Sequence, residues 1–135
     1  MPHYKIYKNS ISKKSSNNLF KLTLQLIQSF EKDFGKNMYF SGWDDINFNK
    51  HLIKLRKNKK KTFSSLYNSL SKSHALRKMP FENKLHKIAS KFLDIDESNL
   101  TIRGITFRMD APKDNRNSYG WHQDNAYDKY HLNSR

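Results

Sequence analysis

The chain has 135 residues, a formal net charge of +14, 36% hydrophobic residues and no cysteine. This length is enough for one domain with a hydrophobic core, and the lack of cysteine excludes disulfides, thiolate metal sites and a cysteine nucleophile. No apolar run approaches the ~20 residues of a membrane span, and the N-terminus lacks the apolar segment of a secretory signal. We therefore expect a cytoplasmic protein without a membrane span, whose oligomeric state the sequence does not indicate.

The positive charge has two interpretations. A pI near 10.0 is typical of nucleic-acid-binding proteins, and the dense block "KLRKNKKK" at Lys54–Lys61 could contact phosphates. The alternative is a Lys- and Asn-rich composition inherited from an AT-rich genome, because lysines recur along the whole chain and arginines are fewer. We favour the compositional interpretation and keep nucleic-acid binding as the alternative.

Residues 1–15 are polar and basic without a sustained period, and we interpret them as a flexible basic arm. From Ser16 onward, apolar residues recur every three or four positions, which predicts an amphipathic helix. Ser16 or Asn17 could cap its start, and Gly35 could end it. The stripe consists of Leu19, Leu22, Leu26, Phe30 and Phe34.

Further stripes predict more helices. Asp44 is a candidate cap for a helix that carries Ile46 and Leu55, Thr62 for a helix with Phe63 and Leu66, and Pro80 suits the first turn of another helix. We therefore expect residues 16–98 to form a helical N-terminal region.

The period changes in residues 99–135. In "LTIRGITFRMD", Phe107 and Met109 alternate with Thr106, Arg108 and Asp110, which is typical of a strand. The polar stretch "APKDNRNSYG" predicts a loop, and "WHQDNAY" a second strand. Helices followed by strands indicate the α+β class.

His122 and Asp124 are one residue apart on the second predicted strand, so they should project to the same side. An imidazole and a carboxylate placed in this way could supply two ligands of a two-His-one-carboxylate Fe(II) site. An exposed strand end with a polar face is the alternative, and the spacing alone favours it.

The segment "RGITFRMDAPKDNRNSYGWHQDNAYDKYHLNS" resembles the phytanoyl-CoA dioxygenase family of Fe(II)/2-oxoglutarate oxygenases. The resemblance is carried by a strand, a charged residue before Pro112, a polar loop and the motif Trp121-His122-Gln123-Asp124. It implies the first strands of a double-stranded β-helix (jelly roll), with His122 and Asp124 as iron ligands. It also implies 2-oxoglutarate as co-substrate, and dioxygen with a small organic or lipid-like substrate as partners.

By analogy with that family, the pocket for substrate or co-substrate would include Thr106, Arg108, Asp110 and Tyr127. The family's second histidine and its arginine for 2-oxoglutarate come well after the metal pair, whereas this sequence stops 11 residues after Asp124. We therefore expect the N-terminal part of a truncated oxygenase, an incomplete domain with little activity alone. A small basic nucleic-acid-binding protein or a helical interaction protein is the alternative function.

Overall fold

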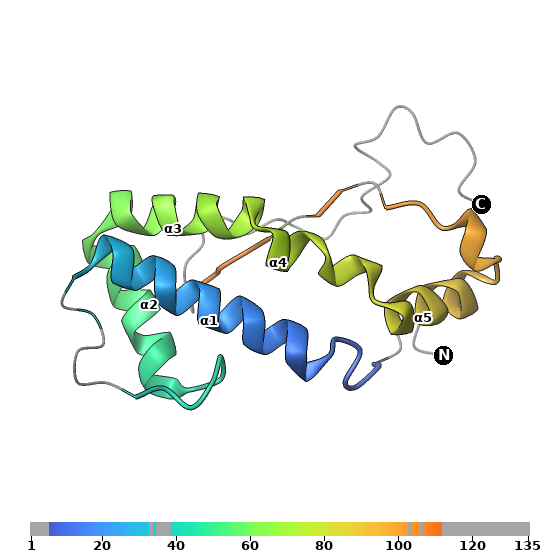
Figure 1. The fold of residues 1–135 in the computed structure, drawn as a ribbon, viewed down its shortest axis with the longest axis horizontal. Helices are drawn as coiled ribbons and strands as arrows, with labels where there is room; N and C mark the ends of the chain where they lie inside the picture. The colour runs from blue at the N-terminus through green and yellow to red at the C-terminus, as the bar shows by residue number, and fades with distance from the viewer. Residues whose placement is uncertain (1–5, 33, 35–38, 103, 106, 112–135) are drawn as a thin grey trace.

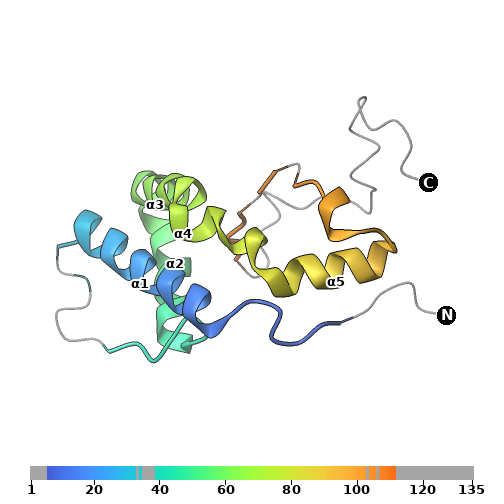
Figure 2. The same cartoon turned by 45° about the vertical axis from the view of Figure 1, so that its right-hand side comes forward.

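The computed structural model describes residues 6–32, 34, 39–102, 104–105 and 107–111. In this part the chain forms five α-helices and two short 3-10 helices (Figure 1). They are α1 (Lys13–Phe30), α2 (Ile46–Asn58), α3 (Lys60–Lys72), α4 (His74–Arg77), η1 (Met79–Phe81), α5 (Asn83–Leu93) and η2 (Glu97–Asn99). Helices α1, α2 and α3 pack together at one end of the molecule, and α5 lies at the other end (Figures 1 and 2).

Helix α1 begins three residues before the predicted start at Ser16, because Ser12 rather than Ser16 caps it. The Ser12 hydroxyl accepts a hydrogen bond from the Ser15 backbone N–H at 3.1 Å, which satisfies one of the first amides of the helix. Ile27 is fully buried at the centre of the core. Phe34 is also buried, although α1 ends before it.

Helices α2 and α3 arise from one continuous apolar pattern that is broken at Lys59, the cap residue shared by both helices. Asp45, next to the predicted Asp44, caps α2 by accepting hydrogen bonds from the N–H groups of Asn47 and Phe48. These backbone contacts, led by one from Ser41, hold the pKa of Asp45 below its usual value. After the break at Lys59, α3 packs against both α2 and α1, and the apolar faces of α2 and α3 join one core. The buried side chains of α2 and α3 in this core are Phe48, Leu55, Phe63, Leu66 and Leu70.

The chain leaves this core through α4 and η1, where Pro80 lies in the short 3-10 helix rather than in an α-helix. Helix α5 follows, and it contains no buried residue. It ends at Asp94, whose left-handed conformation (φ 55°) is one that Asp tolerates better than most residues. Helix α5 packs mainly on its short neighbours η1 and η2.

The predicted fold class, α+β with the first strands of a jelly roll, is wrong: the described part of the chain is helical and contains no strand or sheet. The expected side-chain alternation does occur at residues 107–111, where Phe107 and Met109 pack against the core and Arg108 and Asp110 are exposed. The backbone, however, is bonded by helix side chains in place of a neighbouring strand. None of the helices described is both long and apolar enough to cross a membrane.

Candidate functional site

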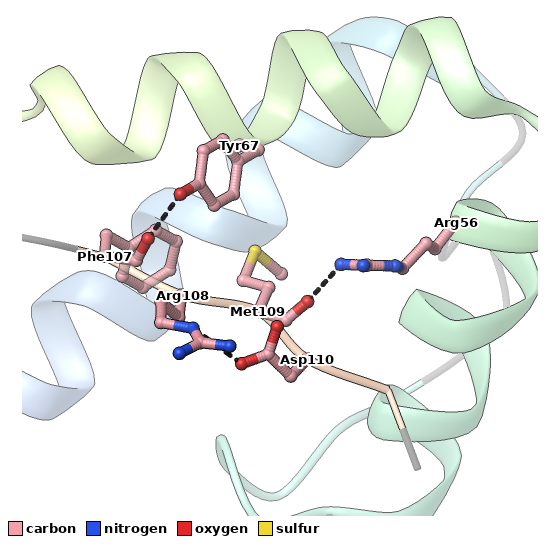
Figure 3. Close-up of polar contacts among 6 residues, drawn as sticks. All are labelled: Arg56, Tyr67, Phe107, Arg108, Met109 and Asp110. Atoms are coloured by element: carbon pink, nitrogen blue, oxygen red, sulfur yellow. Dashed lines mark hydrogen bonds and ion pairs between the residues drawn. The ribbon is translucent and has the colours of Figure 1, made fainter. Parts of the chain in front are cut away.

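The extended segment, residues 107–111, runs alongside α2 and α3 and is held there by two side chains (Figure 3). The Tyr67 hydroxyl donates a hydrogen bond to the carbonyl of Phe107, and the Arg56 guanidinium donates one to the carbonyl of Met109. The rings of Tyr67 and Phe107 also contact each other, with centroids 5.8 Å apart. Polar and apolar contacts from two helices thus fix both the position and the direction of this segment.

Arg56 is oriented by its own neighbourhood. Its guanidinium lies 5.2 Å from the centre of the Phe63 ring, a distance at which a cation is attracted to the face of an aromatic ring. Phe63 and Tyr67 are four residues apart on α3, so they project from the same side of that helix. Helix α3 therefore supplies both the tyrosine that binds the segment and the ring that orients the arginine.

A cavity of about 380 Å³ opens beside the extended segment. Leu52, Ile53 and Phe63 form its apolar wall, and Arg108 and Asp110 line it from the segment itself. Arg108 Nε and Asp110 Oδ2 form an ion pair at 2.9 Å, with side chains 45% and 39% exposed. At this exposure the pair contributes at most about 1 kcal/mol to stability. The lining of the cavity thus combines an apolar wall with the cationic side chains of Arg56 and Arg108 and the anionic side chain of Asp110.

The structure brings together two of the six residues predicted for the site. Arg108 and Asp110 both line the cavity and form an ion pair with each other. Thr106, His122, Asp124 and Tyr127 lie outside the described residues. The described residues contain no group of three or more His, Cys, Asp or Glu side chains that could hold a metal ion.

Sequence reasoning missed Arg56 and Tyr67. Arg56 is the sole arginine in the basic block at Lys54–Lys61, and a planar guanidinium can both donate hydrogen bonds and pack over an aromatic ring, as it does at Phe63. The single arginine among these lysines was the one signal available in the sequence. Tyr67 fits the apolar spacing of the helix predicted around Phe63 and Leu66, and nothing in its local pattern indicates a partner 40 residues away.

A smaller cavity of about 190 Å³ lies near the end of α1 and is lined by Glu31, His51 and Lys59. Lys59 forms an ion pair with Glu31. The His51 Nε2 atom is buried without a hydrogen-bond partner in the described part of the chain, and the ring packs 4.3 Å from Phe34. Burial lowers the pKa of His51, so the neutral imidazole is favoured there.

Comparison of the chain with protein-family models, with curated proteins and with solved structures finds no match.

Proposed function

We propose that this chain contributes to a non-haem Fe(II)/2-oxoglutarate-dependent oxygenase that resembles the phytanoyl-CoA dioxygenases, with His122 and Asp124 as iron ligands. The observation that carries the proposal is the motif Trp121-His122-Gln123-Asp124, which follows Pro112 and a polar loop in this sequence. The motif lies outside the described residues, so the proposal rests on residue types and spacing.

The donor set fits the metal. One imidazole nitrogen and one carboxylate oxygen are two of the three protein donors that non-haem Fe(II) oxygenases use, and the remaining positions stay open for other ligands. Bound Fe(II), together with 2-oxoglutarate and dioxygen, supplies the chemistry for hydroxylating a C–H bond. The part of His122 and Asp124 is to hold the ion.

The size of the cavity beside the extended segment supports the proposal of a small organic substrate. Its volume of about 380 Å³ falls within the ~300–1,000 Å³ usual for small-molecule pockets. We propose that Leu52, Ile53 and Phe63 contact an apolar part of the substrate, and that Arg108 and Asp110 orient a polar group. In the sequence, the segment ends at Ala111, ten residues before Trp121.

Titration with Mn(II), an air-stable substitute for Fe(II), tests the metal pair without requiring turnover. Free Mn(II) gives a strong electron paramagnetic resonance signal that weakens on binding. We expect weak, saturable binding to the chain. The affinity should fall by at least about tenfold in His122→Ala and in Asp124→Ala, because losing even a residue that only orients a metal ligand lowers metal affinity by about 10–100-fold.

His74→Ala is the matched control, because His74 is exposed on α4, far along the chain from the motif. It should bind Mn(II) like the unsubstituted chain. Equal affinity in all four proteins, or no binding by the unsubstituted chain, would contradict the assignment of His122 and Asp124.

A further inference from the structure

The charges of this protein are segregated by secondary structure. None of the five α-helices contains an Asp or Glu. Acidic residues lie instead at helix boundaries, where Asp45 and Asp96 accept hydrogen bonds from backbone N–H groups. Between residues 46 and 72 there are eight Lys or Arg and no acidic residue. The α2–α3 pair therefore carries more uncompensated positive charge along the chain than α1 or α5.

Two cationic side chains of this region are already engaged in contacts within the fold. Arg56, in the middle of the basic block, is directed inward to the Met109 carbonyl and the Phe63 ring. Lys59 forms its ion pair with Glu31. Arg56 and Lys59 of the block "KLRKNKKK" thus have partners within the fold, and the break at Lys59 divides the remaining lysines between two helices.

On α2, the exposed lysines form a stripe on the outer face. Lys50, Lys54 and Lys57 are spaced four and three residues apart, so they lie on one side of the helix. Phe48 and Leu55 are buried on the opposite side. Packing of the apolar face therefore fixes this row of ammonium groups toward solvent.

On α3, exposed polar side chains form a second stripe. Lys61, Ser65, Asn68 and Lys72 are spaced four, three and four residues apart, and all four are exposed. The helical rise places Lys61 and Lys72 roughly 16 Å apart, about the length of five base pairs. Lysine, serine and asparagine, the residue types of this stripe, are among those that contact phosphates and sugars in protein–DNA complexes.

We propose that the basic face, consisting of Lys50, Lys54, Lys57, Lys61 and Lys72, binds duplex nucleic acid through its phosphate backbone without sequence preference. Lysines act as point charges on phosphates, and the bidentate reading of bases typical of arginine is missing from this face. The basic face shares no residue with the proposed metal pair, so it goes beyond the oxygenase proposal and stands or falls separately.

A lipid surface fits the basic face less well. Helices that lie on membranes combine basic residues with exposed aromatic or large aliphatic side chains. Helix α3 has no exposed large hydrophobic residue, and on α2 these are Ile46 and Ile53. Ile53 also lines the cavity beside the extended segment. The lysines are thus accompanied mainly by polar groups, as contact with phosphates in water requires.

The test compares two variants with the same loss of charge. Lys54→Gln, Lys57→Gln and Lys61→Gln are combined in one variant, and Lys84→Gln, Lys87→Gln and Lys91→Gln, all exposed on α5, in the control. Fluorescence anisotropy of a labelled 20-base-pair DNA duplex, measured from 50 to 200 mM salt, gives affinity and salt dependence. Far-ultraviolet circular dichroism verifies that both variants are folded.

If the three lysines each contact a phosphate, the slope of log K against log[salt] should fall in magnitude by roughly 2.7 in the basic-face variant. Its affinity near 0.1 M salt should drop at least about tenfold, and the α5 control should change by less than half as much. Equal weakening in both variants would overturn the proposal, because it would reflect net charge alone. Absence of binding to the DNA duplex would also overturn the proposal. So would binding to phosphatidylserine vesicles without binding to the duplex.

Discussion

The two ends of the molecule present similar apolar patterns and very different burial. Helix α3 contains Leu66 and Leu70, which are fully buried, within a core formed by α1, α2 and α3. Helix α5 is just as regular in sequence, with Leu85, Ile88 and Phe92 spaced three and four residues apart, yet no residue of α5 is buried. Amphipathic spacing therefore predicts that a helix forms, and does not predict how much surface it buries.

The difference lies in the number of partners. Helix α3 contacts three other α-helices, whereas α5 packs mainly on two 3-10 helices of three residues each. A helix that lacks a large apolar neighbour keeps part of its apolar face in water, and Leu93 at the end of α5 is 56% exposed. Because buried apolar area is the main source of stability, the two ends should contribute very unequally to the free energy of unfolding.

The largest expected effect comes from the same substitution made at each end. Leu66→Ala should lower the free energy of unfolding by about 2–5 kcal/mol, because it removes buried methyl groups and leaves a cavity. Leu93→Ala should cost about 1 kcal/mol or less, because its side chain is largely in solvent. Urea denaturation followed by circular dichroism measures both. Similar losses in the two variants would mean that the ends are equally well packed.

A link between the ends gives the next largest effect. Glu82, just before α5, accepts hydrogen bonds from the Ser12 N–H at 2.8 Å and from the Ser12 hydroxyl at 3.0 Å, at the start of α1. Ser12→Ala removes both the cap of α1 and one of these bonds, and should cost about 0.5–2 kcal/mol. We expect α5 amides to lose protection from hydrogen exchange as well. Unchanged exchange in α5 would show that Glu82 does not connect the two regions.

The same link predicts acid sensitivity. Hydrogen bonds from the Ser15 hydroxyl and from Ser12 hold the pKa of Glu82 below the usual 4.5. A carboxylate with a lowered pKa stabilises the folded state above its usual pKa, and this contribution disappears as the pH falls through the lowered value. The cost of Ser12→Ala should therefore be smaller at pH 3 than at pH 7.

The smallest expected effect concerns His51, within the core end. Burial lowers its pKa below the usual 6.5, so the neutral ring stabilises the fold above pH 6.5, and this stability is lost as the pH falls through the lowered value. His51→Phe keeps a ring against Phe34 and removes the titrating group. Its melting temperature should fall less between pH 7.5 and 5.5 than that of the unsubstituted chain. Identical decreases would exclude His51 as a source of pH dependence.

The helices were predictable because their signals are local. Apolar residues spaced three and four apart identified the helical stretches. The prediction of Thr62 as a cap was wrong, because α3 begins at Lys60 without a side-chain cap. Two other boundaries shifted to a residue that provides the better cap. Ser12 takes this role in place of Ser16, and Asp45 in place of Asp44. In each case the chain uses the side chain that reaches the first free backbone amides.

The contacts at the candidate site were not predictable in the same way. The alternation at residues 107–111 correctly separated Phe107 and Met109 from Arg108 and Asp110, but alternation fits any extended chain with one buried side. Whether such a chain pairs with a strand or lies against helices depends on distant residues. Here Tyr67 and Arg56, 40 and 53 positions away, supply the hydrogen-bond donors.

The absence of acidic residues from the five α-helices that the structure describes has a consequence for folding itself. Two pairs of like charges lie one turn apart, Lys50 with Lys54 on α2 and Lys87 with Lys91 on α5. Each such pair destabilises its helix by about 0.2–0.5 kcal/mol. Dissolved salt screens this self-repulsion. A polyanion bound only to the folded chain would add the free energy of its binding to the stability of the fold. Counter-ions should therefore stabilise the folded state of this protein, and its melting temperature should rise with ionic strength.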